Sequence, residues 1–376
     1  MNSENAPVDL SNWLEPPHNR WAFHHVADLL DTVTISNYSG NVTALPQQLV
    51  DLNEVSFSAA DGSITTWGQH LNDTFCDAIC VVHGGSIVYE NYFNNLNVQS
   101  QHLLMSVTKS VTAAAVGIAV GRGLLSIDDL VVDIAPEFAG TSLDGCTVRH
   151  LIDMTAGTEF VENYDLYSDP EADNPLLEYE RQSGFRPLGN RPVVGVLKHF
   201  ATYPLARPHG ALFDYRSPLT NIVARIVEIV NGIPFQDVLS RDIWSSFGME
   251  HPATISVDPL GFPIAEAGMS CTVRDLARFG LAYLNDGLLN DQRVLPESWV
   301  TDTRETDDEY HNAFWIKVPD TEFTGWGIFG QFVWVHRPSR TVIARFSTYP
   351  EAASPSLTAE TFRGFNAVAH FLANHS

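Results

Sequence analysis

Apolar and polar positions follow strand-like patterns towards the two ends of the chain. A hairpin is expected over residues 78–94, where two β-rich runs flank a turn at 83–86. Further strands are expected at 328–336 and 341–347, joined by a short segment that contains proline. Strands at both ends predict an antiparallel sheet to which both ends of the chain contribute.

The middle of the chain shows helical spacing instead. Residues 103–125 are rich in alanine, valine and glycine and are apolar on nearly all sides, which predicts a buried helix that ends at a glycine. Apolar residues recur at intervals of three and four over 219–230, and a glycine follows them. Amphipathic helices are also expected over 274–284 and 357–373.

These elements predict an α/β (α+β) fold, in which helices flank an antiparallel sheet and a mainly helical region is inserted. Residues 1–104 together with 285–376 are expected to form the sheet domain, and residues 105–284 the helical domain. A chain of 376 residues is long enough to bury a large core in one or two such domains.

The charge of the chain narrows the range of partners. Its formal net charge is −24, which repels the phosphate backbone and anionic lipid, so neither nucleic acid nor a membrane is an expected partner. No apolar run is long enough to span a bilayer. The first 19 residues are polar and lack the basic and apolar stretches of a secretory signal, so a cytoplasmic location is expected.

Metal or disulfide chemistry has little support in the sequence. The four cysteines are scattered and are expected to be buried free thiols: Cys76, Cys80, Cys146 and Cys271. No H-E-x-x-H motif occurs, and the histidines form no obvious ligand cluster. We therefore expect no metal site.

Ser106 and Lys109 form an S-x-x-K motif inside the most apolar predicted helix. Three residues apart on a helix, the two side chains project from the same face. A serine hydroxyl is a weak nucleophile at neutral pH, and a lysine can activate it as a neutral base or stabilise a neighbouring oxyanion as a cation. The chain has only three lysines, so one in an apolar helix favours a catalytic role over a side chain that merely extends to water.

Motifs of other enzyme classes are absent from the sequence. The nearest approach to a G-x-S-x-G nucleophile elbow, at 140–145, is one residue too long. No P-loop and no dinucleotide-binding fingerprint occurs.

Four segments follow the S-x-x-K motif in a characteristic order. They resemble segments of the serine β-lactamase and penicillin-binding protein superfamily: 147–157, 213–217, 268–278 and 294–299. The resemblance implies a β-lactamase-like fold and implies that Tyr215, in the second motif, serves as general acid and base. It implies no metal or organic cofactor.

Two further segments are similar to the 6-aminohexanoate-dimer hydrolase (nylon oligomer hydrolase) branch of that superfamily: 15–23 and 103–110. Members of this branch cleave a linear amide and usually also short carboxylic esters, as family VIII-type carboxylesterases do. The resemblance implies Ser106 as nucleophile, Lys109 as its partner and Tyr215 as general acid/base, and Tyr164 matches the tyrosine that contacts the amide. The implied partner is a small-molecule amide or ester, and the branch is compatible with a homodimer.

The best match to the third superfamily motif is 325–328. The resemblance implies that the backbone N–H of Ile328 pairs with that of Ser106 as an oxyanion hole. Trp326 either lines the substrate pocket or is an ordinary strand residue between two glycines. No cation occupies the first position of the motif. Such a cation helps to hold the substrate carboxylate in β-lactamases and penicillin-binding proteins, so its absence argues against β-lactam chemistry.

Two polar positions depart from the family patterns: Glu266 stands where an asparagine is expected, and Ser217 lies in a second motif without its usual asparagine, whereas Glu180 keeps the carboxylate. The nylon-oligomer branch binds the free amino group of its substrate with an acidic residue and, in active forms, an asparagine. The matching positions are Glu180 and Glu266, whose carboxylates either strengthen recognition of an ammonium group, repel each other, or point to solvent. The second motif also lacks the asparagine of penicillin-binding proteins, and Ser217 can instead donate a hydrogen bond to Lys109.

The sequence therefore predicts a serine hydrolase that cleaves short linear amides or esters through an acyl-enzyme. Three alternatives stay open. A carboxylesterase with little amidase activity would use the same residues. A β-lactamase or D-peptidase is disfavoured by the missing cation and by the polar start of the chain. A catalytically silent binding protein on this fold is disfavoured by the intact trio.

Overall fold

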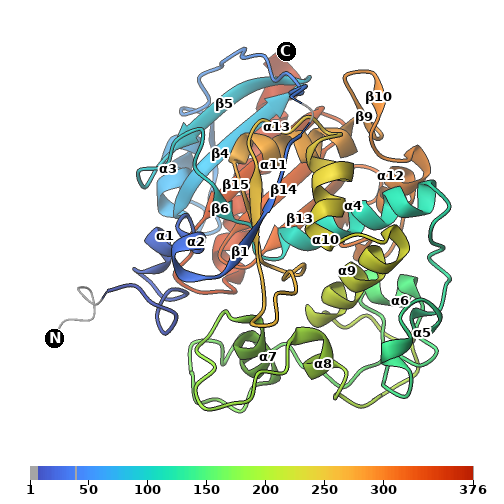
Figure 1. Ribbon diagram of the computed structural model, residues 1–376. Helices are drawn as coiled ribbons and strands as arrows, with labels where there is room; N and C mark the ends of the chain where they lie inside the picture. The colour runs from blue at the N-terminus through green and yellow to red at the C-terminus, as the bar shows by residue number, and fades with distance from the viewer. Residues whose placement is uncertain (1–6, 39, 376) are drawn as a thin grey trace.

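A seven-stranded antiparallel sheet dominates the upper part of Figure 1, where the computed structural model describes residues 7–38 and 40–375. Its strands, in spatial order, are β11 (Tyr310–His311), β12 (Phe314–Val318), β13 (Glu322–Gly327), β14 (Gln331–His336), β15 (Thr341–Ser347), β4 (Cys76–His83) and β5 (Ser86–Tyr92). Strand β4 pairs with β15, so both ends of the chain build one sheet. The predicted hairpin and the predicted sheet are confirmed.

Helices cover both faces of this sheet. On one face, α11 (Val273–Leu284) contacts β4, β14 and β15. Gly280 permits this close approach, because a Cβ there would lie 2.8 Å from Val333 Cγ2. On the other face, α13 (Pro355–His375) packs with Trp334 in a second hydrophobic core. Successive strand residues point to opposite faces, so Val333 and Trp334 belong to different cores.

A smaller antiparallel sheet and two short ribbons complete the β-structure. The smaller sheet has the order β1 (Thr32–Ile35), β7 (Ala253–Ser256), β8 (Met269–Cys271) and β6 (His102–Leu103). The ribbons are β2 (Ser56–Ser58) with β3 (Ile64–Thr66), and β9 (Leu288–Leu289) with β10 (Gln292–Arg293). Strand β6 directly precedes the S-x-x-K segment, so its pairing with β8 fixes where that segment begins.

The middle of the chain forms the helical lower part of Figure 1. Its helices are α4 (Val107–Gly121), α5 (Val131–Ile134), α6 (Val148–Ile152), α7 (Pro175–Ser183), α8 (Val196–Phe200), α9 (Pro218–Asn231) and α10 (Phe235–Leu239), with short non-α turns at Pro136–Phe138 and Ser240–Trp244. The remaining helices are α1 (Asn19–Ala22), α2 (Val26–Leu29), α3 (Trp67–Asp73) and α12 (Glu297–Arg304). Helix α4 contacts both α9 and β13, so it lies where the helical region meets the sheet.

Two predicted boundaries are wrong, and both differences shape the site. Helix α4 begins at Val107 and not at residue 103, because Leu103 pairs with Ser270 in the smaller sheet. The strand predicted from residue 328 begins at Gln331, because 328–330 turn between β13 and β14. Phe329 has a positive φ of 61° in that turn. The other predicted helices and strands are present.

The predicted division into two domains stays a prediction, although one contact bears on its boundary. Residues 105–284 were assigned to the helical domain, yet α11 at the end of this range packs on the large sheet. A boundary before Val273 therefore fits the packing better than one at residue 285.

Three chemical features of the described ranges bear on function. No helix within 7–38 or 40–375 has the length and apolar character needed to cross a membrane. The four cysteines are buried free thiols, as predicted, and burial raises the pKa of Cys76 and Cys80 to about 12. Among these same residues, no group of three or more His, Cys, Asp or Glu side chains could hold a metal ion.

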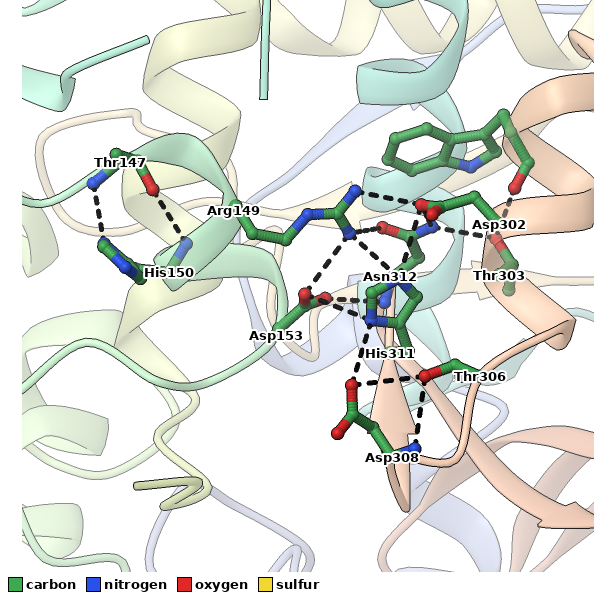
Figure 2. Close-up of polar contacts among 11 residues, drawn as sticks. Thr147, Arg149, His150, Asp153, Asp302, Thr303, Thr306, Asp308, His311 and Asn312 are labelled. Atoms are coloured by element: carbon green, nitrogen blue, oxygen red, sulfur yellow. Dashed lines mark hydrogen bonds and ion pairs between the residues drawn. The ribbon is translucent and has the colours of Figure 1, made fainter. Parts of the chain in front are cut away.

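A charged network ties α6 to the edge of the large sheet (Figure 2). Arg149 Nη2 lies 2.9 Å from Asp302 Oδ2. His311 stands between two carboxylates, with Nδ1 3.1 Å from Asp153 Oδ2 and Nε2 3.3 Å from Asp302 Oδ2. Burial alone would lower the pKa of His311, but the two aspartates raise it to about 9. His311 is therefore a cation in the folded protein at neutral pH.

This network should make stability depend on pH above neutrality. Because the folded-state pKa of His311 exceeds its ordinary value of about 6.5, its stabilising contribution is complete below that pH and is lost as the pH rises through about 9. The shift corresponds to about 3 kcal/mol at most. Urea unfolding of the wild type and His311→Gln should therefore differ most near pH 6 and least near pH 10. A difference that stays constant across this range would contradict the assignment.

Candidate active site

Ser106 lies at the amino end of α4, which is buried among the sheets and α9. Its side chain is almost enclosed, with the residue 8% exposed. Met105, directly before it, has a positive φ of 46°, an unfavourable conformation for a residue with a side chain. Such strain persists only where the surroundings enforce it, and it is common at active sites. The pairing of β6 with β8 and the start of α4 together enforce it here.

Lys109 stands one helical turn after Ser106 and is buried, with 1% exposure. Its Nζ donates hydrogen bonds to Ser106 Oγ at 2.7 Å and to the Glu266 carbonyl oxygen at 2.8 Å. The ammonium also lies 5.2 Å from the ring centroid of Tyr215. The geometry expected from the S-x-x-K spacing is therefore present, and the lysine is held against the serine hydroxyl.

Tyr215 comes just before α9 and completes the group around Ser106. Its ring stacks on Trp315 with centroids 5.6 Å apart and an interplanar angle of 22°. Burial raises the pKa of the Tyr215 hydroxyl, while the Lys109 charge lowers it; the Glu162 charge raises it and the hydrogen bond with Ser106 lowers it. The net effect is a raised pKa. The structure thus brings together all three residues that the sequence proposed as catalytic.

The backbone around Ile328 approaches the backbone of Ser106. A Cβ on Gly327 would lie 2.9 Å from the Ser106 nitrogen and 2.7 Å from the Leu104 carbonyl oxygen, so only glycine fits there. Neither the Ser106 nor the Ile328 N–H donates a hydrogen bond to another described residue. Their role as an oxyanion hole, which the resemblance implies, stays a prediction.

A cavity of about 310 Å³ opens beside Ser106. Aromatic side chains supply much of its wall: Tyr164, Tyr215, Trp315, Trp326 and Tyr349. Ile328 and the segment 352–354 add further lining, and no Lys, Arg or His is among the described residues that line it. Tyr164 and Trp326 thus face the space where a substrate would lie, although their contacts with substrate stay predictions. Two larger cavities elsewhere in the protein are lined by none of Ser106, Lys109 and Tyr215.

Trp326 is supported from outside the cavity. Lys317 Nζ lies 5.3 Å from the Trp326 ring centroid and 4.8 Å from that of Phe362. A cation over an aromatic face is attracted by the ring quadrupole. This contact links Trp326 to α13 and helps to hold the cavity wall in place.

The two predicted ammonium-binding carboxylates do not line the cavity. Glu180 Oε2 accepts a hydrogen bond from Arg186 Nε at 2.5 Å, and its Oε1 accepts one from Tyr167 Oη at 2.7 Å. Glu266 contacts Lys109 through its backbone oxygen, and burial raises the pKa of its carboxyl to about 7. The resemblance implied that both residues bind a substrate ammonium group, but it did not reveal these partners.

The hydrogen bond suggested between Ser217 and Lys109 is wrong, while a role for Ser217 in substrate binding stays a prediction. Its hydroxyl donates a hydrogen bond to Glu162 Oε1 at 2.9 Å and not to Lys109. Glu162 and Trp315 also line the cavity, and the sequence patterns predicted neither as a site residue. Glu162 lies two residues before Tyr164, and this proximity was the only sequence signal that could have pointed to it.

The arrangement can perform acyl transfer. A serine hydroxyl is held by a buried lysine, a tyrosine stands within reach of both, and the backbone at Gly327, directly before Ile328, lies close to the Ser106 nitrogen. These are the parts that nucleophilic catalysis at a carbonyl requires.

Comparison with known proteins places this geometry in context. Residues 68–363 match the model of the family described as Beta-lactamase. The chain is 31% identical over 365 residues to the 6-aminohexanoate-dimer hydrolase of Paenarthrobacter ureafaciens. This alignment covers 91% of this chain and 88% of that protein. A solved Bacillus anthracis protein, described as a putative 6-aminohexanoate-dimer hydrolase, superposes with a TM-score of 0.90 at 26% identity, over 99% of this chain and 98% of that one. A family VIII carboxylesterase shares the fold, with a TM-score of 0.59 at 16% identity over 80% of this chain and 95% of that one.

Proposed function

The chain belongs to the beta-lactamase family of serine hydrolases, and we propose that it cleaves short linear amides or esters through an acyl-enzyme on Ser106. One observation carries this proposal: the hydrogen bond from buried Lys109 to Ser106 at the wall of an aromatic cavity. The similarity to 6-aminohexanoate-dimer hydrolase supports the amide as one substrate class.

In the acylation step, Ser106 Oγ attacks the substrate carbonyl carbon, and its proton passes to the unit formed by Tyr215 and Lys109. Lys109 Nζ lies 5.2 Å from the Tyr215 ring centroid, and its charge lowers the pKa of the Tyr215 hydroxyl, so we assign the role of base to the pair and not to one residue. The N–H groups of Ser106 and Ile328 bind the oxyanion. The same unit then returns the proton to the leaving amine or alcohol as the C–N or C–O bond breaks.

Deacylation repeats these steps with water. The Tyr215–Lys109 unit takes a proton from water, whose oxygen attacks the acyl carbon, and the proton returns to Ser106 Oγ as the acyl–serine bond breaks. No group beyond the side chains and backbone named here takes part in the proposed sequence.

The cavity wall favours a carboxylesterase as the second candidate. The two carboxylates that implied recognition of an amino-terminated amide, Glu180 and Glu266, do not line the cavity, while its lining is rich in aromatic residues. Ester cleavage needs no ammonium recognition. A β-lactamase or D-peptidase has less support, because the described lining contains no cation to bind a substrate carboxylate.

Two substrates and one covalent probe test the proposal. The wild-type protein should hydrolyse p-nitrophenyl acetate and the linear 6-aminohexanoate dimer, and a fluorophosphonate should attach to the peptide that contains Ser106, as mass spectrometry can determine. Cleavage of the ester alone would assign a carboxylesterase. Absence of both hydrolysis and labelling would leave a binding protein on this fold and refute the proposed function.

A further inference from the structure

A carboxylate in the cavity wall connects two parts of the site. Glu162 Oε1 accepts hydrogen bonds from the Tyr164 hydroxyl and from Ser217 Oγ, the latter at 2.9 Å. Its Oε2 accepts the Ser217 backbone N–H at 2.7 Å. Three donors therefore surround one carboxylate, and Glu162 itself lines the cavity together with Ser106.

These contacts join segments that the chain alone does not hold together. Glu162 and Tyr164 lie in a segment without regular secondary structure, whereas Ser217 is the N-cap residue directly before α9. The side chain of Ser217 does not cap this helix. The Glu162 carboxylate instead accepts the backbone N–H of Ser217, one of the N–H groups at the start of a helix that have no partner within it. A negative charge there is also favoured by the helix dipole. Tyr215 lies two residues before Ser217, so a fixed helix start fixes its position too.

Glu162 also contributes to the charge around Tyr215. The titratable groups that interact with Tyr215 include Lys109 on α4, Glu162, Tyr164 and, from β11, Tyr310. Burial and the Glu162 charge both raise the pKa of Tyr215, while Lys109 lowers it. The neighbouring Asp214 is held in ion pairs with two arginines. Loss of the Glu162 charge alone should therefore lower the pKa of Tyr215.

We propose that Glu162 is a positioning residue. It fixes Tyr164 and the amino end of α9, and thereby keeps Tyr215 correctly placed relative to Ser106. This inference rests on the proposed function. It adds a residue that the catalytic motifs do not contain and that acts through its neighbours. Its hydrogen-bond partners are Tyr164 and Ser217, which lie beside the cavity that also contains Ser106.

Glu162→Gln tests the inference, because it removes the charge at nearly constant volume. Glu159→Gln is the matched control: it makes the same change three residues earlier, at an exposed side chain outside the cavity. For p-nitrophenyl acetate, Glu162→Gln should lower kcat by about 10- to 100-fold with little change in KM. The limb of its pH–rate profile that reports Tyr215 should move to lower pH. Glu159→Gln should match the wild type.

The outcomes separate this inference from the proposed function. If wild type and Glu159→Gln are active and Glu162→Gln equals them in kcat and pH profile, the inference is overturned while the function stands. A lower kcat with an unshifted profile would also overturn it, since that pattern indicates a structural role only. If the wild type neither hydrolyses the ester nor labels at Ser106, both fail.

A second variant keeps the inference testable if Glu162→Gln does not fold. Ser217→Ala removes one donor to the carboxylate and leaves the backbone donor in place. Its kcat should fall severalfold without a rise in KM, because the amino end of α9 is less firmly held. Wild-type kcat in a folded Ser217→Ala protein would refute the positioning role.

Discussion

Ser106→Ala is expected to reduce kcat for the ester and the amide by at least about 10⁴-fold. The substitution removes the hydroxyl that Lys109 Nζ holds at the cavity wall, and alanine offers no alternative nucleophile. The residual rate should come from the free N–H groups and from substrate binding alone. Steady-state kinetics with p-nitrophenyl acetate and with the 6-aminohexanoate dimer measure the loss.

Ser110→Ala is a matched control on the same helix. Ser110 lies one turn further along α4, and its hydroxyl donates a hydrogen bond to the Ala313 carbonyl oxygen at 2.7 Å. Loss of this bond should lower stability by about 1 kcal/mol or somewhat more while kcat stays near that of the wild type. Equal activity in Ser106→Ala and wild type would remove Ser106 from the mechanism.

Local spacing predicted the nucleophile pair well, because helix geometry alone places two residues three apart on one face. Ser106 and Lys109 needed no knowledge of distant segments to be placed side by side. Tyr215 is different, since it reaches the pair from a segment more than a hundred residues away, and only the family resemblance pointed to it. The site's core was therefore predictable, partly from geometry and partly from resemblance.

Side-chain partners across the fold were the part that the sequence could not supply. The sequence does not distinguish a glutamate that binds substrate from one that pairs with an arginine. Glu180 pairs with Arg186. Lys109 was the partner suggested for Ser217, but the hydroxyl of Ser217 contacts Glu162 instead. Glu162 lies in an irregular segment that has no periodic pattern. Such choices depend on tertiary packing, which single-sequence patterns do not encode.

The fold shows the same division between local and distant information. Periodicity predicted α9 and β15 closely, because their apolar faces are continuous over many residues. It extended the nucleophile helix too far at its amino end, because Leu103 is as apolar as the helix but pairs with a strand from residues 269–271. Because the helix begins only at Val107, the Ser106 N–H has no intrahelical partner.

Lys109→Met should lower kcat strongly while it changes the free energy of unfolding only a little. The buried ammonium activates Ser106 and lies against Tyr215, so its removal should lower kcat by about 10³-fold. Methionine has a similar length and avoids the cost of burying a charge, so the free energy of unfolding should change by no more than about 2 kcal/mol in either direction. The exposed Lys198, changed to methionine, controls for loss of a positive charge.

The double variant Ser106→Ala/Lys109→Met then tests whether the two residues act as one unit. If Lys109 works only through Ser106 and its acyl-enzyme, the double variant should be no less active than Ser106→Ala alone, since residues of one catalytic unit are strongly non-additive. Multiplicative losses would mean that Lys109 contributes by a separate route, such as binding the substrate. Retention of wild-type kcat in Lys109→Met would show that the hydrogen bond to Ser106 Oγ is structural, and the mechanism would then need another base.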